Sequence, residues 1–222
     1  MVAEQTAEIR QTRDVALLTL AKLAELRDGT TGQHVERIAA YCRCLARVVA
    51  EGPYGPLDEE WITQLEHSSP LHDIGKLAIP DAILRKPGPL DAAEWAIMRT
   101  HAAMGGDTLL SVQSRHQGSD FLRMAVEIAY HHHERWDGRG YPAGLAGADI
   151  PLSARIVTLV DAYDAITSAR PYKPPFAHGE ARRLIVADRG GHFDPLLVDA
   201  FLAVEEEIRQ IQRRGADTPS PA

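Results

Sequence analysis

The chain has 222 residues and a formal net charge of −7, and hydrophobic residues make up 45% of it. This length allows one good-sized domain with a helical extension, and the apolar content is enough for a large core. The acidic balance argues against binding to long nucleic acids, which requires a broad basic face. It still allows a small anionic substrate to be held by a few local cations.

The two cysteines, Cys42 and Cys44, are too few and too close together for a disulfide framework. We expect them to be ordinary helix positions in a reducing cytosol. No apolar run approaches the roughly 20 residues of a membrane span. The N-terminus also lacks a signal-peptide core, so we expect a cytoplasmic protein without membrane contact.

Helical periodicity runs through almost the whole chain. In the first helix, Leu17, Leu20, Ala21 and Ala24 recur at i, i+3, i+4 and i+7. Gly-Pro at the end of the second helix is a strong stop signal. The expected helices cover residues 13–29, 34–52, 58–72, 91–110, 121–136, 154–168, 179–190 and 194–214.

Two helix starts carry specific signals. Asp91 followed by Glu94 resembles a capping box, and Asp194-Pro195 supplies an N-cap with proline at the first helical position. A Gly-rich loop covers residues 136–153, and no internal repeat or strand ladder is evident. The sequence therefore predicts an all-α bundle of about seven to eight helices.

Histidines and carboxylates recur at the helix ends, beside Gly-rich turns. In the stretch SSPLHDIGKLAIPD, the adjacent His72 and Asp73 would point about 100° apart on a helix. Two metal ions, or one ion with a bridging carboxylate, would use both residues more readily than one small ligand. Such hard or borderline ligands without thiolate suit Mn²⁺ or Fe²⁺ better than a structural zinc. The candidate ligands are His34, His72, Asp73, His101, His132, His133 and Asp161.

Several motifs together resemble the HD-GYP family of the HD phosphohydrolase superfamily. They are HDIGK at 72–76, HHERWDGRGYPAGL at 132–145 and ARIVTLVDAYDAITSARPYK at 154–173, in the order expected of that family. The resemblance extends roughly from Arg27 to Leu202. It implies an HD-domain helical bundle that hydrolyses the bacterial second messenger c-di-GMP to linear pGpG and sometimes on to GMP.

The resemblance also implies residue roles. The seven candidates would bind two divalent ions, with iron or manganese expected, and Asp73 would bridge the ions. Lys76 would lie near the attacking hydroxide and the scissile phosphate. Arg170 and Lys173 would hold the substrate phosphates. Tyr141, in the Gly-Tyr-Pro signature, would lie in a loop that faces the substrate or a protein partner.

One departure concerns a third metal. Family members with three metals carry a glutamate four residues before the first histidine, where this chain has Thr30. A hydroxyl is a poorer ligand for a hard dication than a carboxylate, so we expect two ions. Asp164, three residues after Asp161 on the same helix face, is expected to support the ligands.

The sequence is expected to divide into three parts. An N-terminal helix is expected over residues 1–28, the catalytic domain over 29–214 and a disordered tail over 215–222. The first helix is expected to pack on the domain and to contribute a homodimer contact, or to be the stalk of a longer parent protein.

Three alternatives remain at this point. The same centre would also serve another substrate, such as cGAMP, pGpG or a further nucleotide. A c-di-GMP-responsive binding module with weak turnover would work through protein partners instead. A di-iron oxygenase is a third reading, against which the phosphate-facing Arg170 and Lys173 argue.

Overall fold

The computed structural model describes residues 2–28, 33–115, 119–168 and 175–216. Thr30, Arg170 and Lys173 lie outside these ranges, as does most of the tail that was expected to be disordered. Within them the chain is helical, and the only β-type pairing is an isolated bridge between Arg189 and Phe193. The all-α prediction is confirmed. None of the described helices has the length and apolar character needed to cross a membrane.

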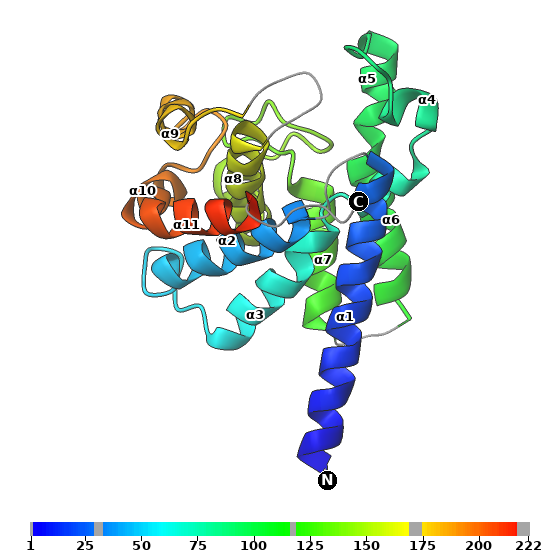
Figure 1. The fold of residues 1–222 in the computed structure, drawn as a ribbon, viewed down its shortest axis with the longest axis vertical. Helices are drawn as coiled ribbons and strands as arrows, with labels where there is room; N and C mark the ends of the chain where they lie inside the picture. Colours follow the sequence, from blue (N-terminus) through cyan, green and yellow to red (C-terminus); the bar gives the residue numbers. More distant parts are fainter. Residues whose placement is uncertain (1, 29–32, 116–118, 169–174, 217–222) are drawn as a thin grey trace.

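Eleven α-helices and three short 3₁₀ turns form the described part of the chain (Figure 1). The α-helices are α1 (Val2–Asp28), α2 (Gln33–Val49), α3 (Glu59–Ser68), α4 (Asp81–Leu84), α5 (Ala92–Met98), α6 (Thr100–Gln113), α7 (Asp120–His131), α8 (Leu152–Thr167), α9 (His178–Ala187), α10 (Pro195–Ala203) and α11 (Glu205–Ala216). The 3₁₀ turns are η1 (Ser69–Leu71), η2 (Ile74–Ala78) and η3 (Gly147–Asp149).

The predicted helix starts are present. The Asp58 side chain accepts a hydrogen bond from the Trp61 backbone N–H at the start of α3. Asp91 and Glu94 form the predicted capping box of α5. Asp194 caps α10 by accepting from the Leu196 backbone N–H. Each cap satisfies backbone donors that a helix N-terminus would otherwise leave unpaired.

The helix count of the described chain exceeds the predicted seven to eight for three reasons. The segment predicted as one helix after Asp91 is two, α5 and α6, which meet at Arg99. The segment predicted as one helix after Asp194 is also two, because Val204 leaves helical angles with φ −120° and ψ 20° between α10 and α11. The four-residue α4 was not predicted.

The main hydrophobic core lies where α2 and α8 pack together, with α10 and α11 over them. Tyr163 on α8 makes an edge-on contact with Tyr41 of α2 and a tilted contact with Phe201 of α10, with ring centroids 5.6 and 5.3 Å apart. Such aromatic pairs contribute beyond the area that they bury. Cys42 and Cys44 are buried free thiols in this core, as predicted.

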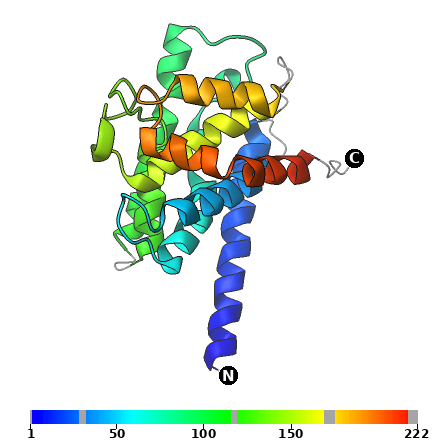
Figure 2. The same ribbon diagram turned by 90° about the vertical axis from the view of Figure 1, so that its left-hand side faces the viewer.

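The helix α1 is only partly joined to this body. Its N-terminal part projects beyond the other helices, whereas its C-terminal end lies against them (Figures 1 and 2). Ala21, Ala24 and Glu25 are buried at that end. The last two turns of α1 are therefore part of the domain's packing, next to η1 and η2.

Candidate metal centre

The residues proposed as ligands come from five separate elements. His34 lies in the first turn of α2, and His72 and Asp73 lie between η1 and η2. His101 lies in the first turn of α6, and His132 and His133 directly follow α7. Asp161 is in the middle of α8. The seven side chains predicted from the sequence all lie in the described structure.

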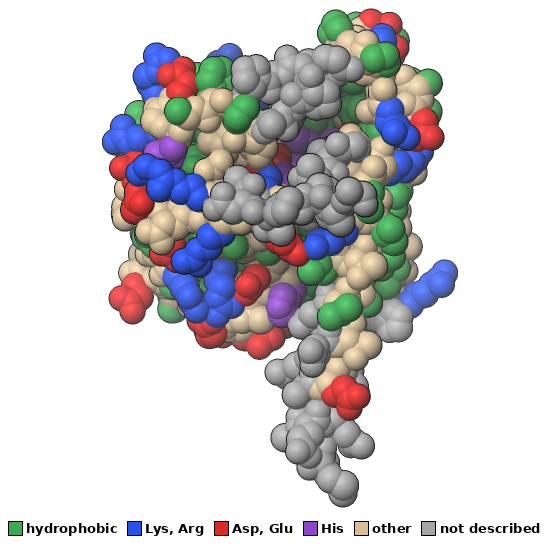
Figure 3. All heavy atoms as spheres, viewed as in Figure 1, with side chains coloured by type: hydrophobic (Ala, Val, Ile, Leu, Met, Phe, Trp, Pro, Cys, Tyr) green, Lys and Arg blue, Asp and Glu red, His purple; other side chains and the backbone are tan. Residues whose placement is uncertain are grey.

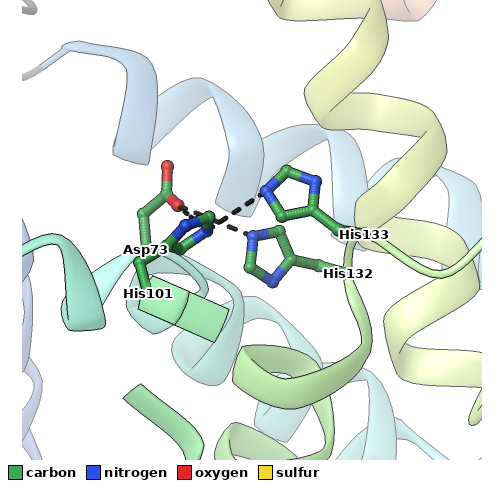
Figure 4. Close-up of side chains that lie close together, drawn as sticks. All are labelled: Asp73, His101, His132 and His133. Carbon is green, nitrogen blue, oxygen red and sulfur yellow. Dashed lines mark hydrogen bonds and ion pairs between the residues drawn. The ribbon is translucent and has the colours of Figure 1, made fainter. Parts of the chain in front are cut away.

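The side chains form two groups. The Asp73 group contains Asp73, His101, His132 and His133, and the His34 group contains His34, His72 and Asp161. In each group, one ligand atom from every member lies within 4.8 Å of the others. Figure 4 shows the four members of the Asp73 group pointing toward one another.

Asp73 joins the two groups. Its Oδ1 lies 3.2 Å from His101 Nε2 and 3.5 Å from His132 Nε2, whereas its Oδ2 lies 3.3 Å from His72 Nε2. One carboxylate thus presents one oxygen to each group. This is the arrangement that a bridging ligand requires.

A close backbone approach brings Asp73 to His101. At Gly75 in η2, a Cβ atom would lie 1.9 Å from the His101 carbonyl oxygen and 2.5 Å from the Gly105 nitrogen. No other residue fits there without moving the backbone. The glycine of the HDIGK motif therefore lets η2 pack directly on α6, which places the aspartate of one element beside the histidine of the other.

The histidine rings are oriented through their second nitrogens. The Nδ1 atoms of His72, His101 and His132 lie 2.9, 2.7 and 3.0 Å from the backbone carbonyls of Ser69, Met98 and Ile128. A carbonyl only accepts, so in the neutral ring each Nδ1 carries the proton and each Nε2 presents a lone pair. This tautomer is the one expected of histidines that bind a metal through Nε2.

His34 is oriented by Asp164 instead. Its Nδ1 lies 2.7 Å from Asp164 Oδ2, and Arg37 Nε donates to Asp164 Oδ1 over 2.6 Å. Asp164 is 1% exposed, and the charges of Arg37 and His34 outweigh its burial, holding its pKa well below the usual range. The supporting contact expected of Asp164 from the sequence is present.

Charge within the centre is arranged for a cation. Although burial favours the neutral acid, Lys76 and His72 hold the pKa of Asp73 well below its usual range. Burial lowers the pKa of His132, and burial with the neighbouring His132 lowers that of His133 well below its usual value. The carboxylate is thus ionised and these two imidazoles are neutral, as metal ligands must be.

Buried lone pairs provide a direct test of fit. Asp73 Oδ1, His72 Nε2 and His132 Nε2 are buried and make no hydrogen bond of good geometry within the described chain. Buried polar atoms without a partner are rare and call for an ion or a water. Five imidazoles and two carboxylates, without a thiolate, suit a divalent ion of hard or borderline character. The residues present therefore fit divalent metal binding.

Lys76 lies at the edge of the centre. Its Nζ is 2.8 Å from Asp73 Oδ2 and 2.6 Å from Asp28 Oδ2. Burial alone would favour loss of its proton, but Asp73 and Asp28 raise the pKa of Lys76 well above its ordinary value. The side chain is therefore an ammonium ion next to the bridging carboxylate.

The Gly-rich loop covers one ligand. The Tyr141 ring stacks on His133 with centroids 4.7 Å apart, and the Arg99 guanidinium lies 5.2 Å from the Tyr141 centroid. Glu134, which is buried, accepts hydrogen bonds from the backbone of Ala143 and Gly144 at 2.7 and 3.1 Å.

Figure 3 shows histidine side chains reaching the surface between the part formed by α8 and the part formed by α5 and α6.

The sequence reasoning missed Glu25, which is 6% exposed and lies on α1 with its Oε1 3.5 Å from His34 Nε2. A signal was present, because Glu25 follows Ala21 by four residues and therefore falls on the apolar face of the helix. His131, the first residue of the triple-histidine run, belongs to neither group, and its Nδ1 lies 3.9 Å from Glu134 Oε1.

The known proteins that this chain resembles in sequence and fold include cyclic-dinucleotide phosphodiesterases. A cyclic di-GMP phosphodiesterase of Vibrio cholerae is 50% identical over 95% of this chain, and a 3′3′-cGAMP-specific phosphodiesterase 2 of that organism is 42% identical over 92%. The chain spans 43% and 37% of the length of these relatives. The crystal structure of a V. cholerae cyclic GMP-AMP phosphodiesterase superposes with a TM-score of 0.60 at 20% identity, covering 91% of this chain and 53% of that one, and so shares the fold.

Residues 19–197 match the HD domain family. This range includes every member of both ligand groups, and its motifs follow the order described above. The chain belongs to the HD domain family and, by its HD and Gly-Tyr-Pro motifs, to the HD-GYP type within it.

Proposed function

We propose that this protein is a metal-dependent phosphodiesterase that hydrolyses c-di-GMP to linear pGpG, and further to GMP, at a binuclear centre. The observation that carries the proposal is the division of the ligands into two groups that share Asp73. The relatives named cyclic di-GMP phosphodiesterases support this substrate.

The mechanism follows from what the side chains do around the scissile phosphodiester. A pair of divalent ions, iron or manganese, would be held by the two groups, and when bound it activates water at neutral pH and neutralises charge on the phosphoryl oxygens. Asp73 holds the two ligand groups together. The Lys76 ammonium lies beside it and adds positive charge where negative charge develops on phosphorus.

Recognition of the substrate is assigned to residues around the centre. Arg170 and Lys173 would hold the phosphates, since a guanidinium offers a planar fork to phosphate oxygens. Tyr141 would contact the substrate beside His133, over which it stacks. A protein partner docking on the Gly-rich loop is the second role proposed for Tyr141.

A direct assay tests the proposal. The purified protein would be reconstituted anaerobically with Fe²⁺ or Mn²⁺, its metal content measured and c-di-GMP hydrolysis followed by chromatography of the products. We expect about two metals per chain and formation of pGpG followed by GMP. Full metal occupancy without hydrolysis would reject the proposed activity and would favour the binding module.

A second candidate substrate is 3′3′-cGAMP, which relatives 42% and 35% identical to this chain are named for. The same assay with c-di-GMP, 3′3′-cGAMP and pGpG at equal concentrations separates the candidates by kcat/KM. We expect c-di-GMP to give the highest value, because the relative with 50% identity is named for it.

We extend the proposal to the organisation of the chain. Residues 29–214 would form the catalytic domain, preceded by the helix over 1–28 and followed by the tail over 215–222. The exposed leucines Leu20, Leu23 and Leu26 on α1, each more than half exposed, support a homodimer contact there. Light scattering during size-exclusion chromatography would test the dimer, with a monomeric mass counting against it.

The buried free cysteines are in keeping with a cytoplasmic protein.

A further inference from the structure

Glu25 brings a second carboxylate, beside that of Asp161, to the His34 group from a helix that carries no predicted ligand. Its neighbours on the same face of α1, Ala21 and Ala24, are buried against the domain. Glu25 is 6% exposed, so its carboxylate lies within the packed centre and not at the surface.

The contacts of His34 define what can lie beside Glu25. Because His34 Nδ1 is 2.7 Å from the Asp164 carboxylate, that nitrogen carries the proton in the neutral ring. Its Nε2 then presents a lone pair, 3.5 Å from Glu25 Oε1 and 3.5 Å from Asp161 Oδ1. A nitrogen and two carboxylate oxygens thus face one another inside the centre, as the ligands of a single ion would.

The distances suit a shared metal better than a proton on Nε2. Charge-assisted N–H···O bonds are about 2.7–2.9 Å long, shorter than either contact of His34 Nε2. Two ligands that each lie about 2.1 Å from one ion at a tetrahedral angle are about 3.4 Å apart. Both 3.5 Å separations match that value.

We propose that Glu25 is a ligand of the ion held by His34, His72 and Asp161. It supplies from α1 the carboxylate that Thr30 does not supply from the following loop. The His34 group then has two imidazoles and two carboxylates, and the Asp73 group has three imidazoles and one carboxylate. The inference rests on the metal-binding part of the proposed function and is independent of the substrate.

Metal affinity provides the first test, in the full chain and without substrate. Glu25→Gln keeps the shape of the side chain and removes its charge. Glu36→Gln is the matched control, because Glu36 is a half-exposed carboxylate that pairs with Lys22. Mn²⁺ would be titrated against a chelator of known affinity. We expect Glu25→Gln to bind one ion normally and the second at least tenfold more weakly, since even partners one step from a metal contribute roughly tenfold to hundredfold. The control should bind both ions normally, and unchanged affinity in Glu25→Gln would overturn the assignment.

Thermal unfolding separates a ligand from a purely structural residue. A ligand that binds only the folded state stabilises it. Without metal, the unfolding temperature of Glu25→Gln should be no lower than that of the parent, because a neutral amide replaces a buried carboxylate. The rise in unfolding temperature on adding Mn²⁺ should be smaller in Glu25→Gln than in the parent. Equal destabilisation with and without metal, or failure to fold, would mean that Glu25 is structural.

A shorter carboxylate completes the series. Glu25→Asp keeps the charge but reaches less far, so its affinity for the second ion should fall between those of the parent and Glu25→Gln. An aspartate variant no better than the glutamine variant would refute the role. Because none of these readouts uses c-di-GMP, failure of the proposed substrate and failure of this ligand are distinguishable.

Discussion

The two ligand groups differ in how their histidines are oriented and protonated. In the Asp73 group, His101 and His132 are oriented by backbone carbonyls at helix ends, and burial lowers the pKa values of His132 and His133. In the His34 group, neighbouring carboxylates outweigh burial and raise the pKa of His34, and that of His72 to about 9. His132 and His133 are therefore neutral lone-pair donors, whereas His34 and His72 retain protons that a metal must displace.

The supports differ at one ligand, because His72 is oriented by a backbone carbonyl like His101 and His132, whereas His34 is oriented by a side chain. A backbone carbonyl in a helix is fixed by the fold, so no single side-chain substitution removes it. The orientation of His34 depends on Asp164, which is itself held by Arg37 and Ser168. We therefore expect metal binding by the His34 group to be more sensitive than metal binding by the Asp73 group to substitution of the surrounding residues.

The largest effect is expected where the groups meet. Asp73→Ala removes the one carboxylate that faces both groups, so at most one weakly held ion should remain and hydrolysis should fall to background. Elemental analysis and the c-di-GMP assay measure the two effects. Asp199→Ala, which removes a half-exposed carboxylate paired with Arg189, is the control and should change neither. Full occupancy with normal turnover in Asp73→Ala would refute the bridging role.

The role of Asp73 as the link between the two groups was predictable from the sequence. The structure around Asp73 was only partly predictable. The adjacent His72 and Asp73, the His132–His133 pair and the caps at Asp91 and Asp194 are local patterns, and local patterns determine local structure. The boundary between α5 and α6 lies instead at Arg99, next to the place where η2 packs against the start of α6 through Gly75. Apolar periodicity continues across that boundary and gives no sign of it.

Glu25 illustrates the same limit within the centre. On its own helix it is an acidic residue at an otherwise apolar position, and only the packing of α1 beside α2 brings it to His34. The roles of Arg170, Lys173 and Thr30 still rest on the motifs that contain them, because these residues lie outside the described ranges.

Removing one histidine from each group tests whether the groups are separate sites. His133→Ala and His34→Ala should each lose one of two ions, because each group loses one donor and the other keeps all of its own. Mn²⁺ titration of the single and double variants measures the stoichiometry. The double variant should retain no tightly held ion. Loss of both ions in either single variant would mean that the groups bind metal as one unit.

The contrast in supports predicts a smaller and selective effect for Asp164→Asn. The amide still fits but no longer offers a full negative charge to Arg37 and His34. The ion of the His34 group should bind roughly tenfold to hundredfold more weakly, as for other partners that orient a metal ligand. The ion of the Asp73 group should be unaffected. Chelator competition resolves the two affinities, and equal weakening of both would contradict the comparison.

The smallest effect is expected at Tyr141, which covers the Asp73 group without belonging to it. Burial raises the pKa of its hydroxyl, so the group remains a neutral donor at physiological pH. Tyr141→Phe keeps the ring that stacks on His133 and removes only this donor. A neutral hydrogen bond contributes about 0.5–1.5 kcal/mol, so kcat/KM for c-di-GMP should fall about twofold to tenfold if the hydroxyl contacts substrate. Metal content should not change.

Tyr141→Ala also removes the stacked ring and should lower kcat/KM further, because His133 is then exposed to water. If Tyr141→Phe is fully active and Tyr141→Ala is not, the ring alone matters, and Tyr141 serves the Asp73 group as a cover and does not contact substrate through its hydroxyl.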